Sequence, residues 1–137
     1  MSILIETERE GMLRQRIVFN DHDALYADAP ASVGGDESAP DPHDYFDISL
    51  ATCKALTLMM YARKQEMPLD GVSIRITRDS SDERDGQYRL QVDIGLIGDL
   101  GAQARDRLLE VADQCPIHRL MTSGQVEIET RAHLGGA

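Results

Sequence analysis

The chain has 137 residues and a formal net charge of −10, and its length fits one domain, residues 1–137, with one sizeable core. A hydrophobic fraction of 42% is typical of a globular protein. The negative charge disfavours nucleic acid and anionic lipid as partners. No apolar run reaches the roughly 18 residues of a membrane span. The start lacks the features of a secretory signal, so we expect a cytoplasmic protein without a membrane partner.

The first third of the chain predicts two short strands and a long loop. The pattern of residues 13–19 indicates a strand, and a turn signal separates it from a second strand at 24–28. Residues 29–42 are rich in Pro, Gly, Ser and Asp, which predicts a long connection of the kind that often lies over a site. A long helix follows, with Asp41 as N-cap and Pro42 at its first position.

The rest of the chain predicts a hairpin, two helices and a final strand. Val72, Ile74 and Ile76 alternate with polar residues, as in a half-buried strand. The further expected elements are a turn at 82–86, a strand at 87–98, a helix at 101–113, a short helical piece after Cys115 and a strand at 125–134. Because strands joined by tight turns form antiparallel pairs, the fold class is α+β with antiparallel sheet.

The long helix is apolar almost all round. Between residues 48 and 62 the polar residues are Ser49, Thr52, Lys54 and Thr57, and of these only Lys54 is charged. A surface helix would show a polar face every 3.6 residues. One antiparallel sheet covers one face of a helix, so the other face needs a second cover. The simplest supplier is the same helix of another copy, and we therefore expect a tight homodimer.

The two cysteines, Cys53 and Cys115, can be buried fillers or a redox pair. Because Pro116 favours the first position of a helix, Cys115 is expected at its N-cap, where backbone N–H groups and the helix dipole favour thiolate. His118 and Arg119 add positive charge nearby. The alternative is a buried cysteine that ends the preceding helix. Cys53 is in mid-helix and taken alone resembles a filler. Without a CxxC or His-rich ligand set, we expect no metal site.

Two segments resemble the OsmC/Ohr family, named for osmotically inducible protein C and organic hydroperoxide resistance protein. They read DPHDYFDISLATCKALTLMMYARKQEMPLDGVSI and ADQCPIHRLM. The family pattern places a proline and an acidic residue before "LAACxxxT…YAxxxG" on a central helix, and "CPVHR" on a later helix. The matching residues are Pro42, Asp44, Leu50-Ala51-Thr52-Cys53, Thr57, Tyr61-Ala62 and Cys115-Pro116-Ile117-His118-Arg119. The resemblance covers about residues 12–134.

The resemblance implies an OsmC-like fold in which antiparallel sheets wrap around the central helices of an intertwined homodimer. It also implies a thiol peroxidase that reduces organic hydroperoxides without a cofactor. By match, Cys53 would attack the peroxide and become a sulfenic acid, and Cys115 would condense with it into a disulfide. Members of the family are recycled by dithiols, typically dihydrolipoyl groups. An apolar pocket at the dimer seam would favour alkyl hydroperoxides over hydrogen peroxide.

The chain departs from the family at the groups that activate the first thiol, an arginine and a glutamate. The glutamate position is occupied by His43, and the neighbouring Asp44 is the candidate substitute. Eight acidic residues and no Lys or Arg lie between Arg16 and Lys54. The candidate cations are Arg14, Arg16, Lys54 and Arg63. The sequence thus leaves two functions open: a peroxidase, or a noncatalytic dimer that binds a small apolar molecule or senses redox state.

Overall fold

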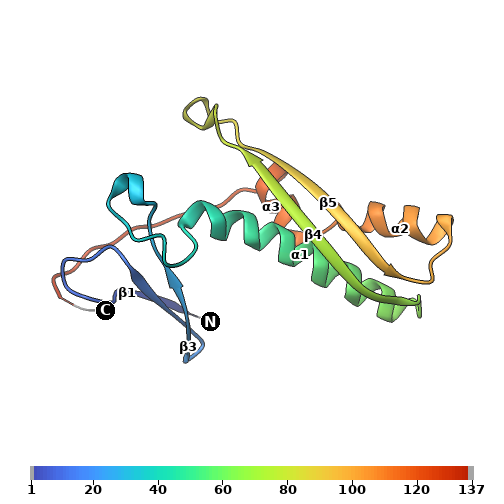
Figure 1. Cartoon of the computed structure of the whole chain (residues 1–137), viewed down its shortest axis with the longest axis horizontal. Helices are drawn as coiled ribbons and strands as arrows, with labels where there is room; N and C mark the ends of the chain where they lie inside the picture. Colours follow the sequence, from blue (N-terminus) through green and yellow to red (C-terminus); the bar gives the residue numbers. More distant parts are fainter. Residues whose placement is uncertain (1, 136–137) are drawn as a thin grey trace. The chain divides into compact units, whose positions relative to one another are not determined.

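The computed structural model describes residues 2–135, which form two compact units (Figure 1). The strand unit comprises the chain up to Phe46 together with the segment from Ile128 onward. The cysteine unit comprises Asp47–Glu127. The long helix α1 (Pro42–Lys64) begins in the strand unit and continues through the cysteine unit. Among the described residues, no helix is long and apolar enough to cross a lipid bilayer.

The strand unit is built on a three-stranded antiparallel sheet in the order β1 (Ile3–Thr7), β2 (Gln15–Phe19), β3 (His22–Ala27). Strand β1 was not predicted from the sequence. Asn20 and Asp21 form the β2–β3 turn with φ angles of 47° and 64°, which two-residue hairpins require because their twist then matches that of the strands. The turn therefore falls where the sequence placed it.

The loop from residue 28 to residue 41 is held by a carboxylate at its start. Asp28 is buried and accepts hydrogen bonds from the amides of Ala29 (2.8 Å) and Ser38 (3.0 Å) and from the Ser38 hydroxyl. These bonds, led by the Ser38 hydroxyl, lower the pKa of Asp28 to about 2. A short 3-10 helix, η1 (Ala31–Val33), lies within the loop. This long connection is thus a hydrogen-bonded turn structure in the strand unit.

Helix α1 begins at Pro42, as predicted, with a reciprocal cap. The Asp41 carboxylate accepts from the amide of Asp44 at 2.8 Å, and the Asp44 carboxylate accepts from the amide of Asp41 at 3.0 Å. Two backbone donors that a helix start leaves without partners are thereby satisfied. The carboxylate of Asp44 also faces the positive end of the helix dipole.

The cysteine unit contains an antiparallel hairpin formed by β4 (Leu69–Asp79) and β5 (Arg89–Gly98). Alternate residues of each strand are half-buried, as the sequence predicted. The connection contains a 3-10 turn, η2 (Glu83–Asp85), and Gly86, which has a φ of 81°. Such a positive φ is accessible to glycine at little steric cost.

The core of the cysteine unit lies among helix α1, helix α2 (Ala102–Ala112) and the hairpin. Its buried members are Leu58, Ala62, Leu69, Leu108, Val111 and Ala112. Helix α3 (Pro116–Ser123) follows α2 after a three-residue turn. The buried residues of α2, Leu108, Val111 and Ala112, face this core.

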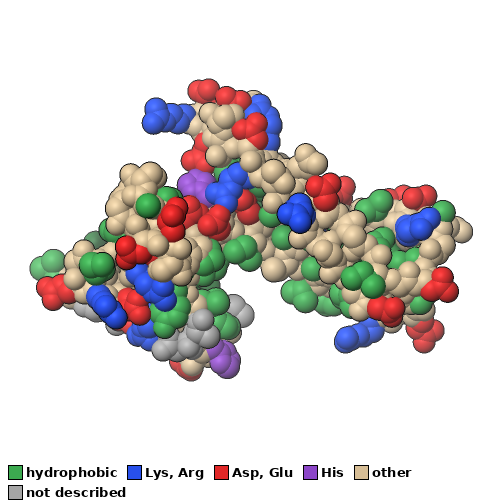
Figure 2. Space-filling view, in the orientation of Figure 1, with side chains coloured by type: hydrophobic (Ala, Val, Ile, Leu, Met, Phe, Trp, Pro, Cys, Tyr) green, Lys and Arg blue, Asp and Glu red, His purple; other side chains and the backbone are tan. Residues whose placement is uncertain are grey.

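Helix α1 buries one face and leaves apolar residues exposed on another. Its buried residues are Asp47, Leu50, Lys54, Leu58 and Ala62. Leu56 and Met60 expose 62% and 68% of their surface. Hydrophobic side chains are also visible on the surface of both units in the space-filling view (Figure 2). One chain therefore covers only part of this apolar helix, as the sequence analysis expected of a single sheet.

The prediction of a final strand at 125–134 is wrong for the single chain. Residues 124–133 have no regular secondary structure, and Ile128 is 82% exposed. The sequence alternates as a strand does, but an extended segment becomes a strand only when its backbone groups pair with a neighbour. Among the described residues the segment belongs to neither sheet.

Candidate functional site

The two cysteine side chains meet in the cysteine unit. Cys53 lies in the middle of α1 and is partly exposed, whereas Cys115 precedes α3 and is fully buried. Both are free thiols, and they lie close enough for the Cys53 side chain to raise the pKa of Cys115. The fold thus brings together two sulfurs that are 62 positions apart in the sequence.

Cys115 is the N-cap residue of α3, as predicted. Its φ and ψ of −65° and 142° are those of an extended residue, and Pro116 occupies the first turn. The backbone amide of His118 donates to the Cys115 sulfur at 3.3 Å. The thiol therefore takes the place that a serine or aspartate oxygen usually has at a helix start.

The expected lowering of the Cys115 pKa is not found. Burial, the largest influence, raises the pKa of this thiol above its ordinary value. The hydrogen bond from the His118 amide and the positive charge of Lys54 act in the opposite direction, but they do not reverse it. Cys115 thus combines the two alternatives of the sequence analysis: it is the N-cap of α3 and it is buried, and burial has the larger effect on its pKa.

Lys54, the residue after Cys53, is buried with a relative exposure of 2%. Its Nζ donates to the backbone oxygen of Ala112 at 2.8 Å and to Oδ1 of Asp113 at 3.3 Å. It also lies 2.9 Å from Nδ1 of His118. Of the four candidate cations in the sequence, Lys54 is the one whose charge acts on Cys115. The sequence signal was the single charge in an otherwise uncharged stretch of helix.

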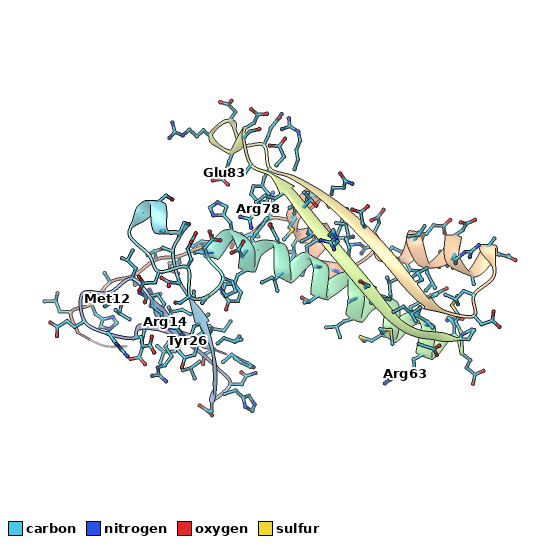
Figure 3. The ribbon with its side chains drawn as sticks, in the orientation of Figure 1. Met12, Arg14, Tyr26, Arg63, Arg78 and Glu83 are labelled. Carbon is cyan, nitrogen blue, oxygen red and sulfur yellow. The ribbon has the colours of Figure 1, made fainter. Side chains whose placement is uncertain are left out.

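The other candidate cations have different surroundings. Arg14, in the strand unit, lies over the ring of Tyr26 at 4.1 Å, pairs with Glu8 at 2.7 Å and donates to the Ser38 hydroxyl at 2.7 Å (Figure 3). Arg16, in the same unit, pairs with Glu6 at 3.0 Å. Arg63 lies exposed in the last turn of α1 (Figure 3).

Asp44, the third predicted site residue, lies in the strand unit, where its carboxylate caps α1. The contacts of this carboxylate with the helix start suit a residue that stabilises the first turn. Its neighbour His43 is exposed and occupies the first turn of the same helix. A catalytic role for Asp44 stays a prediction.

Sequence reasoning missed a second buried charge on α1. Asp47 accepts a hydrogen bond from the Tyr88 hydroxyl at 2.7 Å and pairs with Nε of Arg78 at 2.8 Å. Burial, followed by the bond to Asp47, raises the pKa of Tyr88 to about 12. These contacts tie the start of α1 in the cysteine unit to strand β4, through Arg78, and to the connection before β5, through Tyr88. The sequence signal was the position of Asp47, which lies at helical spacing from the other buried residues of α1.

An open apolar depression of 630 Å³ lies on the sheet of the strand unit. Its lining is Ile3, Ile5, Gln15, Ile17, Phe19, Asn20, Leu25, Ala27, Pro42 and Tyr45. Several of these side chains, including Ile3 and Ile5, are mostly exposed. Within the described part of the chain, no group of three or more His, Cys, Asp or Glu residues could hold a metal ion.

The architecture is therefore α+β with a dithiol at its longest helix, and comparison with known proteins defines its class. The family model of the OsmC-like proteins matches residues 34–131. The chain belongs to this family and has the OsmC-like fold. No curated protein sequence matches significantly.

Solved structures with the same fold come from several bacteria. An osmotic stress induced and detoxification response protein of Psychrobacter arcticus has a TM-score of 0.73 at 20% identity, with 90% of each chain covered. The organic hydroperoxide resistance protein OsmC of Legionella pneumophila has a TM-score of 0.63 at 18% identity, with 90% of this chain and 89% of that chain covered. OhrB of Bacillus subtilis, another organic hydroperoxide resistance protein, has a TM-score of 0.58 at 20% identity, covering 89% and 90% of the two chains.

Proposed function

We propose that the protein is a thiol peroxidase that reduces organic hydroperoxides through a two-cysteine cycle. The observation that carries the proposal is the contact between a partly exposed Cys53 and a fully buried Cys115. A peroxide must reach the sulfur that it oxidises, and exposure favours Cys53 for that step. A resolving thiol needs no access to solvent, only proximity to the first sulfur.

The reaction proceeds in three balanced steps. The Cys53 thiolate attacks the outer oxygen of the hydroperoxide, the O–O bond breaks, and the alkoxide leaves with a proton as an alcohol. The Cys115 thiolate then attacks the sulfur of the Cys53 sulfenic acid, a disulfide forms, and water leaves. Finally a dithiol reduces the disulfide by two thiol–disulfide exchanges and becomes oxidised itself. A dihydrolipoyl group is a dithiol of this kind.

The proposed active form is a homodimer. Its support is the apolar surface that one chain leaves open on α1 at Leu56 and Met60, and on the sheet at Ile3 and Ile5. Scattered exposed hydrophobic residues are ordinary, but contiguous apolar surface on a helix or a sheet marks an interaction site. A second copy would cover such surface and exclude water from the neighbourhood of Cys53, where an alkyl hydroperoxide would bind.

A redox-sensing dimer without peroxidase turnover is the second candidate. It is favoured by the contacts of two arginines of the cysteine unit: Arg78 pairs with Asp47, and Arg107 contacts Tyr61 and Glu110. Neither contact involves a cysteine. In such a dimer Cys53 and Cys115 would still form a disulfide, but peroxide would react no faster with Cys53 than with an ordinary thiol.

The deciding experiment is turnover with cumene hydroperoxide and dihydrolipoamide. We expect consumption of the hydroperoxide that depends on both reagents, and abolition of turnover in Cys53→Ser. Mass spectrometry of the reduced protein after one equivalent of peroxide should find the Cys53–Cys115 disulfide. The matched control is Cys115→Ser, in which Cys53 should still be oxidised once. Formation of the disulfide without turnover would support the redox sensor instead.

A further inference from the structure

Lys54 is a buried cation with three acceptors around its three hydrogens. The acceptors are the oxygen of Ala112, Oδ1 of Asp113 and Nδ1 of His118, at 2.8, 3.3 and 2.9 Å from Nζ. An ammonium is rarely this buried, because removing it from water is costly unless every donor finds a partner. Since the ammonium has only donors, Nδ1 of His118 must accept, which places the imidazole proton on Nε2.

The three acceptors lie on both sides of Cys115 in the chain. Ala112 ends α2, Asp113 follows it, and His118 is in the first turn of α3. Lys54 therefore ties the end of α2 and the start of α3 to α1 across the turn that carries Cys115. Because Cys53 is the neighbour of Lys54 on a regular helix, with a rise of about 1.5 Å per residue, the same tie fixes the position of Cys53 relative to Cys115.

The amino-acid usage of the chain makes this position unusual. The sequence contains two lysines, Lys54 and Lys64, among its 14 Lys and Arg residues. Lys64 lies exposed in the last turn of α1, where a cation complements the helix dipole. Lys54 is in mid-helix and receives no such benefit from its own helix. A compact ammonium can reach three acceptors that point at it from different directions, whereas a planar guanidinium favours flat, forked partners.

We propose that Lys54 is the positioning residue for disulfide closure, clamping the α2–α3 turn so that Cys115 stays within bonding reach of Cys53. This inference rests on the proposed two-cysteine cycle and assigns Lys54 to its second step, not to the attack on peroxide. In that step the Cys115 thiolate displaces hydroxide from the Cys53 sulfenic acid, and the hydroxide takes up a proton and leaves as water. The charge of Lys54 also favours the thiolate form of Cys115, because it lowers a pKa that burial raises.

The test compares Lys54→Met with wild type, using Lys64→Met as the matched control. The reduced proteins are equilibrated with mixtures of reduced and oxidised dithiothreitol, which measures the effective concentration of the two thiols without any peroxide. In Lys54→Met, loss of a hydrogen bond to a charged group should lower this effective concentration about tenfold. Lys64→Met should match wild type. A folded Lys54→Met protein that stays within about twofold of wild type overturns the clamp.

A second measurement separates closure from peroxide attack. Wild type and Lys54→Met react with cumene hydroperoxide in the presence of dimedone, which captures the Cys53 sulfenic acid before it closes. We expect an increase in captured sulfenate of about tenfold in Lys54→Met, with the rate of Cys53 oxidation little changed. The pH midpoint of closure should move upward, and Lys54→Arg, which keeps the charge, should restore that midpoint. If Lys54 acted only through its hydrogen bonds and not through its charge, the pH midpoint of closure would not change.

A third variant covers the case in which Lys54→Met does not fold. His118→Phe removes one acceptor at a partly exposed side chain and leaves Lys54 its bonds to Ala112 and Asp113. The dithiothreitol equilibrium of this variant should still shift toward the free thiols, because the tie to α3 is lost. An unshifted equilibrium in folded His118→Phe also overturns the proposal. Absence of peroxide turnover in wild type, by contrast, leaves the dithiothreitol result intact and refutes only the peroxidase.

Discussion

The hydroxyl of Tyr88 on the hairpin connection donates a 2.7 Å hydrogen bond to Asp47 on α1, a carboxylate that is buried beside Arg78. The pKa of Tyr88 is raised to about 12, first by burial and then by this bond. The folded state therefore holds the Tyr88 proton more tightly than the unfolded chain, where a tyrosine titrates near 10.

This relationship predicts a loss of stability at high pH. The Tyr88 contribution is complete below the unfolded pKa of about 10 and is lost as pH rises toward the folded value of about 12. Urea unfolding at about pH 8 and about pH 11 should give a larger drop for wild type than for Tyr88→Phe. Equal drops in the two proteins would show that Tyr88 ionises freely.

The Cys115→Ser variant should stop the cycle after one oxidation. Its Cys53 can react with peroxide, but the sulfenic acid has no thiol to condense with and becomes open to further oxidation. Mass spectrometry after excess peroxide should find sulfinic acid at Cys53 in the variant and the internal disulfide in wild type. A disulfide between two chains of the variant would contradict this expectation.

The pH dependence of closure follows from the raised pKa of Cys115. A raised pKa keeps this thiol protonated at neutral pH, and the thiolate is the attacking form. Closure should therefore accelerate with pH and level off only above the ordinary thiol value of about 8.5. Stopped-flow measurement of the second phase after peroxide mixing gives this profile. A rate that is already flat between about pH 6 and about pH 8 would contradict it.

A charge at Leu56 should prevent assembly. Leu56→Asp places a carboxylate on the exposed apolar face of α1, and burying it unpaired against a partner costs several kcal/mol. We expect an unfolded or aggregated chain rather than a folded monomer. Leu109→Asp, at an exposed apolar position of α2, serves as the comparison. Sedimentation of a stable, folded wild-type monomer at micromolar concentration would disprove the dimer.

Gly98 should be intolerant of a side chain. Its φ is 151°, and a Cβ built there would lie 2.1 Å from the backbone oxygen of Pro68. Gly98→Ala should therefore lower the free energy of unfolding by more than about 1 kcal/mol. Gly101→Ala is the control, because a Cβ at this helix start meets nothing within 4 Å. Chemical denaturation of both variants measures the difference.

Periodicity and turn signals predicted most of the fold because they depend on local sequence. Pro42 and Asp41 set the start of α1, and the alternation around Ile74 set the hairpin faces. The motif around Cys115 likewise predicted its place at a helix start. These features require no knowledge of distant neighbours.

The remaining features depend on distant neighbours. Whether Cys115 carries a lowered or a raised pKa is decided by its burial, which the sequence does not show. The burial of Lys54 depends on the end of α2, which lies 58 residues further along the chain. The prediction of the last strand was wrong for the same reason: a strand at Ile128 needs a neighbouring strand to pair with.

Among the described residues, β4 and β5 pair only with each other, so each strand of this hairpin is an edge. Edges of this kind are templates for pairing with any extended chain, including misfolded copies of the same protein. Formation of the proposed dimer therefore competes with aggregation, and both reactions accelerate with protein concentration. Refolding yield should consequently pass through an optimum as the protein is diluted, and the unpaired segment after Ser123 would be the part most readily cut by proteases before assembly.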